Sequence, residues 1–147
     1  MDNFRIDIVN AEGPLFSGDA ALVIAPLRDG DAGFLPGHSP LLAILRAGAL
    51  RVQDANGGEQ AFYVSGGFVE VQPRHVTVLA DAGERAADID EALAARAVED
   101  AARHAEEQAG KTDYAHAQAE LAQAAARLSV VRRYRSQTSY SAPERIR

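Results

Sequence analysis

Three short stretches of the sequence contain residue types that could do chemistry. The first is GFLPGHSPLLAIL, residues 33–45, where prolines and glycines surround His38. Loops of this composition often carry functional residues. The histidine could serve as a general base, as a metal ligand or as a contact residue for a partner. The remaining histidines, His75, His104 and His116, show no ligand spacing, so we expect no metal site.

Two further stretches resemble known motifs only in part. DGDAG, residues 29–33, looks like the beginning of a calcium loop, but Pro40 stands where that loop needs a bidentate glutamate. We therefore expect a polar turn. In YVSGGF, residues 63–68, Ser65 precedes two glycines, but Tyr63 stands where a nucleophile elbow needs glycine. We expect a bend between strands, and a hydrolase acting through Ser65 remains only an alternative.

The first half of the sequence predicts short strands, which would position these residues. Residues 3–9 alternate apolar and polar side chains, which is typical of a strand with one buried face. Residues 21–27 are continuously apolar, as in a strand buried on both faces. Tight hairpins are expected at Asn56-Gly57, where both residues suit positive φ, and at residues 72–74. Turn signals about every 8–12 residues predict a β-sandwich or barrel.

The second half of the chain is rich in alanine, the best helix former. Asp88 and Glu91 have the spacing of a capping box, so a helix is expected to begin with Asp88 as its N-cap. The segment 110–113 interrupts the pattern and offers a second cap. Apolar residues recur at steps of three and four, which predicts an antiparallel two-helix hairpin. They are Ala94, Val98, Ala101, Ala105, Tyr114, Ala117, Leu121, Ala124, Leu128 and Val131.

This apolar seam is mostly alanine, and each alanine buries little area. Because burial stabilises by about 25 cal/mol per Å², the seam holds less strongly than a leucine seam would. We interpret the hairpin as marginally stable and able to detach. A hairpin that stays packed on the sandwich is the alternative that the sequence leaves open.

Charge is distributed unevenly along the chain. The net charge is −6, yet residues 127–147 hold six arginines and one glutamate. The acidic body argues against general nucleic-acid binding, and the basic end suggests an acidic partner. The chain has no cysteine, which excludes disulfides and thiolate metal sites. No apolar run is long enough to span a membrane. The first ten residues have the composition of neither a signal nor a transit peptide, so we expect no such segment.

Five blocks together resemble the epsilon subunit of the bacterial F-type ATP synthase. They are IVNAEGPLFSG (8–18), GFLPGHSPLL (33–42), YVSGGFVEVQ (63–72), VTVLADAGERAADID (76–90) and DYAHAQAELAQAAARL (113–128). They occur in order and almost without gaps, and they cover both the strand half and the helix half. Five blocks in register are a far more specific signal than one.

The resemblance implies an α+β fold, with a flattened N-terminal β-sandwich followed by an antiparallel two-helix hairpin. The sandwich would cover residues 1–84 and the hairpin residues 85–134. A basic tail over residues 135–147 has no counterpart in the family and is expected to be flexible.

The resemblance also implies a function and partners. The chain would be a noncatalytic rotor subunit in the central stalk that couples ion-driven rotation of the c ring to ATP synthesis. Its sandwich would bind the gamma subunit and the c ring, and its helices would extend toward the alpha/beta head and restrain ATP hydrolysis. Such a subunit is peripheral on the cytoplasmic face of the bacterial plasma membrane and touches the membrane only through the complex. No nucleic acid and no cofactor are expected.

Site residues carried over from the family fall in two groups. Asp31 and His38 lie at positions whose loops face the c ring, and we interpret His38 as a contact or hydrogen-bonding residue rather than a catalyst. Arg127, Arg132 and Arg133 would contact an acidic segment of the beta subunit in the inhibitory state.

One departure from the family concerns ATP. Some members bind ATP on the folded hairpin through a motif read as Ile/Leu-Asp-x-x-Arg-Ala. Ile89 and Asp90 match its beginning, but Leu93 stands at the arginine position and cannot pair with phosphate. Arg96 lies nearby but is not a secure substitute, so we do not expect this chain to sense nucleotide.

The alternative hypothesis to a rotor subunit is an unrelated binding module, in which the β-sandwich binds a ligand and the hairpin dimerises. The five ordered blocks favour the rotor.

Overall fold

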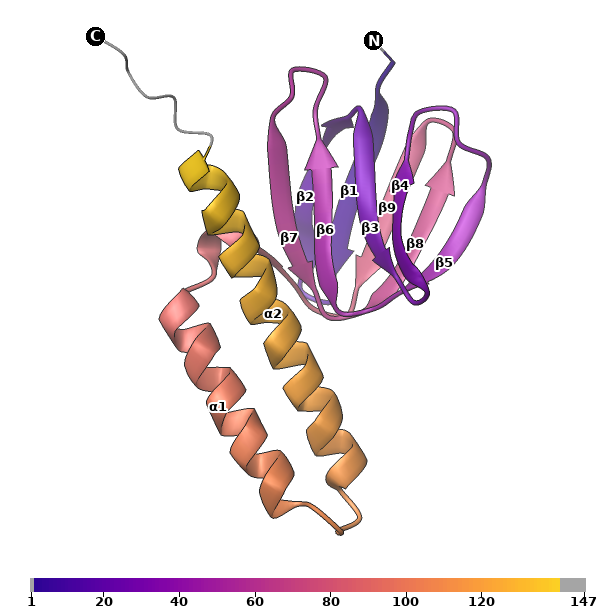
Figure 1. Ribbon diagram of the computed structural model, residues 1–147. Helices are drawn as coiled ribbons and strands as arrows, with labels where there is room; N and C mark the ends of the chain where they lie inside the picture. The colour runs from indigo at the N-terminus through magenta and orange to yellow at the C-terminus, as the bar shows by residue number, and fades with distance from the viewer. Residues whose placement is uncertain (1, 141–147) are drawn as a thin grey trace, which may run out of the picture.

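The computed structural model describes residues 2–140, of which 138–140 are described by their backbone alone. Ten strands precede two helices (Figure 1). The strands are β1 (Phe4–Asn10), β2 (Gly13–Ala20), β3 (Leu22–Leu27), β4 (Gly30–Phe34), β5 (Leu41–Leu45), β6 (Gly48–Gln53), β7 (Glu59–Val64), β8 (Gly67–Gln72), β9 (His75–Ala80) and β10 (Gly83–Arg85). A short 3-10 turn η1 (Ala86–Asp88) leads into α1 (Glu91–Glu107) and α2 (Tyr114–Tyr140).

The strands follow one hydrogen-bonded path that folds over into two layers. Their order is β10-β7-β6-β3-β5-β8-β9-β1-β2, with β4 also paired to β3. Strands β1 and β9 are parallel, and the other pairs are antiparallel. Between β3 and β5 the path passes from one layer to the other (Figure 1). These two strands share a single residue pair, Leu27 with Leu45. The expected sandwich followed by a helical hairpin is confirmed.

Alternation along the strands directs apolar side chains into the space between the layers. Phe4, Ile6 and Ile8 of β1 are buried, as the period-two pattern predicts. Strand β3 differs from expectation, because Leu22 and Ile24 are only half-buried. Its second face is therefore only partly covered.

The turn between β6 and β7 closes by a different device from the one expected. Gly57 has a positive φ of 84°, whereas Asn56 does not. Instead, the Asp54 carboxylate accepts hydrogen bonds from the backbone N–H groups of Asn56 and Gly58, at 2.8 and 2.9 Å. The hydrogen bonds of the Asp54 side chain thus close the turn without a second residue of positive φ.

The first helix begins later than its predicted cap. Residues 86–88 form η1, and Ile89 after it is extended, with φ −84° and ψ 125°. The N-cap is therefore Asp90, whose carboxylate accepts from the Leu93 N–H at 3.1 Å, and the prediction of Asp88 is wrong. Helix α2 begins directly after the predicted break and continues to Tyr140, beyond the expected end of the hairpin at residue 134.

The hairpin has a core of its own that also reaches the sandwich. Helix α1 packs along α2, and α2 contacts β6 and β7 (Figure 1). The predicted seam residues other than Tyr114 are buried or half-buried, and Ala94, Leu128 and Val131 belong to a cluster that includes Tyr63 of the sandwich. Tyr114, at the start of α2, is 41% exposed. No helix within residues 2–140 is long and apolar enough to cross a membrane.

Candidate functional site

The junction between sandwich and hairpin is the first candidate site. Its buried residues form a cluster separate from the sandwich core: Tyr63, Ala86, Ile89, Ala94, Leu128, Val130 and Val131. Tyr63 comes from β7, Ile89 from the link before α1, and Val131 from α2. Alanines from the start and interior of β6, from β7 and from the helices surround it; they are Ala47, which directly precedes β6, and Ala49, Ala61, Ala95 and Ala126.

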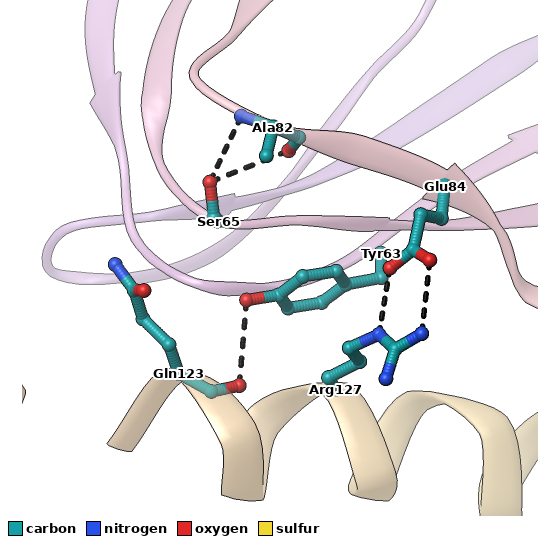
Figure 2. A network of polar contacts seen from close by, with 6 residues as sticks. All are labelled: Tyr63, Ser65, Ala82, Glu84, Gln123 and Arg127. Atoms are coloured by element: carbon teal, nitrogen blue, oxygen red, sulfur yellow. Dashed lines mark hydrogen bonds and ion pairs between the residues drawn. The ribbon is translucent and has the colours of Figure 1, made fainter. Parts of the chain in front are cut away.

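A bidentate ion pair fastens α2 to β10 at the edge of this junction (Figure 2). Arg127 donates from Nε to Glu84 Oε2 at 2.6 Å and from Nη2 to Glu84 Oε1 at 2.9 Å. The hydrogen bonds that Arg127 donates to Glu84 raise the pKa of Arg127 above its ordinary value. Two parallel N–H to carboxylate bonds define both the distance and the orientation of the partners.

Tyr63 supplies a second link across the same junction (Figure 2). Its hydroxyl donates to the backbone carbonyl of Gln123 on α2, at 3.3 Å. Burial raises the pKa of Tyr63, and the neighbouring Glu84 carboxylate raises it further. The hydroxyl therefore remains a proton donor at neutral pH.

The other arginines of α2 differ in their surroundings. Arg132 Nε and Arg135 Nη1 lie 3.3 and 3.0 Å from the two carboxylate oxygens of Glu91, in the first turn of α1. Arg133 is exposed, and no ion pair joins it to the side chains described through residue 137. Of the three predicted head contacts, two are thus paired within the chain.

The structure does not bring Asp31 and His38 together. Asp31 lies at the start of β4 beside the β3–β4 turn, and its carboxylate accepts from Arg46 at 2.6 Å. His38 lies beyond the other end of β4, where its ring meets Phe34 edge-on at 5.2 Å between centroids. A strand of five residues is about 16 Å long, so the two side chains belong to opposite ends of the sandwich.

The residues at the ATP-motif positions have structural roles. Ile89 is buried in the junction, and the Asp90 carboxylate caps α1. Leu93 is 60% exposed and lines an open hollow of about 460 Å³ together with Arg96 and Glu99. A carboxylate from Glu99 beside a single arginine does not suit a phosphate chain, so the residues present do not fit ATP.

The two partial motifs also have structural explanations. Most of the expected polar turn at residues 29–33 belongs to β4, because its backbone pairs with β3. The Ser65 hydroxyl accepts from the Ala82 N–H at 2.9 Å, and it lies 3.4 Å from the Ala82 carbonyl (Figure 2). Gly66 and Gly67 have φ of 134° and 124°, as the predicted bend requires. Within residues 2–140, no cluster of metal-ligating side chains occurs.

Sequence reasoning missed an apolar surface on the outer face of the β5-β8-β9 layer. Ile44, Phe68 and Leu79 stand opposite one another on these strands and are 48%, 49% and 52% exposed. Leu42 is more exposed still, and it borders a hollow of about 620 Å³ that reaches the β3–β4 turn. The sequence does contain a signal for this surface. In LLAIL, residues 41–45, every position is apolar, so apolar side chains point to both faces of the sheet.

A polar network lies beside this apolar row, on β1, β2 and β9. Asp7 accepts from the Ser17 hydroxyl, and His75 Nε2 lies 2.7 Å from its other oxygen. Arg5 donates to the same hydroxyl at 2.7 Å. The Ser17 hydrogen bond is the main cause that lowers the pKa of Asp7 below its ordinary value.

Both halves of the chain match known families. Residues 3–86 match the beta-sandwich domain of the ATP synthase delta/epsilon chain, and residues 87–132 match its long alpha-helix domain. A protein of Alkalilimnicola ehrlichii named ATP synthase epsilon chain is 52% identical over 140 residues, covering 92% of this chain and 96% of its own length. One of the same name from Nitrosococcus oceani is 50% identical over 131 residues, covering 89% and 94%.

A solved structure shares the fold. It is a chain in the Euglena gracilis mitochondrial ATP synthase, from a structure of OSCP, F1 and c-ring, with a TM-score of 0.70 and 20% identity. The match covers 92% of this chain and 81% of that one.

Proposed function

The chain belongs to the ATP synthase delta/epsilon chain family, and from this premise we propose that it is a noncatalytic rotor subunit of the central stalk. It couples rotation of the c ring to ATP synthesis, and its helices restrain ATP hydrolysis. It sits on the cytoplasmic face of the bacterial plasma membrane, held there through the complex. Matches over both halves set aside the alternative of an unrelated sandwich module.

The exposed apolar row is the observation that best supports a stalk partner. A contiguous apolar surface on a soluble domain marks an interaction site. Ile44, Phe68 and Leu79 form such a surface on a rigid sheet, with the polar Asp7 network at its side. We assign this face to the gamma subunit, since an apolar centre flanked by polar groups is typical of a stable interface.

We propose the c-ring contact for the loop of His38 and not for Asp31, because opposite ends of the sandwich cannot both face one ring. The Asp31 carboxylate is half exposed and accepts from Arg46 instead. In the loop of His38, the Gly37 N–H donates to the Pro73 carbonyl at 2.8 Å, which stiffens this loop. A loop that is already ordered loses less entropy on docking.

The head contact is proposed for the arginines of α2. Arg127, Arg132 and Arg133 lie within one stretch of this helix, and arginine pairs bidentately with carboxylates. An acidic segment of the beta subunit is the partner that fits them.

Substitution in the apolar row tests the proposal. Leu79→Glu places a charge where a partner would bury the site, so we expect gamma binding to fall at least tenfold, about 1.4 kcal/mol. Leu93→Glu is the matched control, because Leu93 is similarly exposed but lies on α1. Equal binding by the two variants would contradict the assignment.

Fractionation tests the assembly itself. Membranes solubilised in a mild detergent should carry this chain in the band that hydrolyses ATP. Its absence from that band would contradict the rotor function. Turnover of ester substrates by the isolated chain, lost in Ser65→Ala, would instead favour a hydrolase.

A further inference from the structure

We infer that Glu84 and Glu91 are internal partners that sequester the arginines of α2 while the hairpin is closed, that is, packed on the sandwich. The inference rests on the proposed function for the identity of the external partner, but the closing contacts stand on the structure alone. Its consequence is that Arg127 and Arg132, which belong both to the internal pairs and to the proposed head contact, serve two exclusive purposes. They bind either these two carboxylates or an acidic surface outside the chain.

The two carboxylates sit on the elements that α2 must leave in order to detach. Glu84 belongs to β10 of the sandwich, and Glu91 belongs to the first turn of α1. Glu84 takes both of its bonds from Arg127, whereas Glu91 places one oxygen on Arg132 and the other on Arg135. Two carboxylates therefore hold three arginines. The Glu84 pair breaks when α2 leaves the sandwich, and the Glu91 pairs break when α2 separates from α1.

The apolar part of the junction makes these pairs matter more. Most residues around Tyr63, Ile89 and Val131 are alanines, which bury little area. The Arg127 side chain is 28% exposed, so its pair with Glu84 is partly shielded from water. A shielded bidentate pair contributes more than a fully exposed one. Of the three ion pairs, the one between Arg127 and Glu84 should therefore contribute most to keeping the hairpin closed.

Breaking the Arg127–Glu84 pair from either side gives the decisive comparison. Glu84→Gln and Arg127→Gln remove the same contact, so both loosen the hairpin. Only Glu84→Gln leaves a free arginine for an external acidic partner. The two variants should thus act alike in the isolated chain and differently in the assembled complex.

The isolated chain provides the first measurement. It has no cysteine, so Glu12→Cys in the sandwich and Lys111→Cys in the hairpin loop can carry a fluorescence donor and acceptor. For both variants we expect the ratio of detached to closed hairpin to rise about five- to thirtyfold, as the loss of one such contact would produce. The swapped pair Glu84→Arg with Arg127→Glu should restore closure.

A charge-matched control separates this contact from net charge. Glu120→Gln removes a carboxylate whose ion pair among the described side chains is with His116 on α2 itself, at 3.0 Å. It should leave closure unchanged. If Glu84→Gln and Arg127→Gln also leave closure unchanged, the internal pairing is overturned.

ATP hydrolysis by the assembled complex provides the second measurement. Glu84→Gln should deepen the restraint on hydrolysis, and Arg127→Gln should relieve it or leave it at the parental level. Equal deepening by both would show that Arg127 has no external partner, which overturns the sequestration. If both loosen the isolated hairpin but neither changes hydrolysis, the closing contacts stand and the proposed restraint of hydrolysis is wrong.

Discussion

Asp7 shows how a single carboxylate links three strands of the sandwich. It accepts from Ser17 on β2 and faces His75 on β9, and its pKa is lowered chiefly by the Ser17 hydrogen bond. A carboxyl whose pKa is lower in the folded state adds stability above its unfolded pKa. That stability is lost as the pH falls through the folded value.

We predict that Asp7→Asn flattens the acid limb of the stability curve. The parent should lose stability below about pH 4, where an unfolded aspartate begins to bind protons. The variant should lose less over the same range, because asparagine does not titrate. Urea unfolding between about pH 3 and 7 measures the difference, with exposed Asp2→Asn as the control. Parallel curves for parent and Asp7→Asn would contradict the prediction.

Leu93 carries a prediction about nucleotide. Leu93 lacks the guanidinium that a phosphate needs, and Asp90 is engaged as a helix cap. Millimolar ATP should therefore not raise the melting temperature of the isolated chain. A ligand at 100 times its dissociation constant would stabilise by about 2.7 kcal/mol, which a thermal melt detects easily. A clear upward shift would mean that Arg96 or another group holds the phosphates.

At the scale of elements, β10 is the last strand of the sandwich, and its side chains contact earlier strands. Arg85, its last residue, donates to Gln60 and to the Leu15 carbonyl, at 3.0 and 3.2 Å. Its guanidinium also lies 5.6 Å from the ring centroids of both Phe16 and Phe62. The sandwich core contains no helical residue, so the strands can form it without the hairpin.

We predict that a chain ending after Arg85 folds into a soluble β-rich domain that binds gamma. A chain ending after Gly83 should fold less stably, because it loses Arg85 and the strand pairing of β10. Circular dichroism and chemical unfolding of the two fragments measure this. Aggregation of both would show that the sandwich needs its hairpin.

Across the whole molecule, the positive charge on α2 lies against negative charge on two other elements. Glu84 and Glu91 pair with Arg127, Arg132 and Arg135, and Arg133 stands apart. A variant that removes Arg132 and Arg133 together would mix an effect on closure with an effect on an external contact. A substitution of Arg133 alone tests the external contact without disturbing the pairs that hold the hairpin closed.

We predict that Arg133→Ala raises ATP hydrolysis by the complex while the hairpin stays closed in the isolated chain. The rise should be about two- to fivefold, as a contact of about 0.5–1 kcal/mol would give. Exposed Arg96→Ala on α1 is the matched control. Parental hydrolysis in Arg133→Ala would show that this arginine is only a solvated side chain.

The tail predicted over residues 135–147 continues as helix to Tyr140, and residues 141–147 lie outside those that the structure describes.

The sequence by itself determined the class of the fold, because its signals are local. Period two along Phe4–Ile8 and alanine at helical steps after Asp88 follow from neighbouring residues alone, and the ordered blocks identified the family. The tertiary structure decided which distant side chains meet. Arg127 lies 43 residues from Glu84, and Ile44, Phe68 and Leu79 form one surface only through strand register. No local pattern encodes such pairings, so the sequence led only to an external acidic partner for Arg127, and the fold placed the Glu84 carboxylate opposite it.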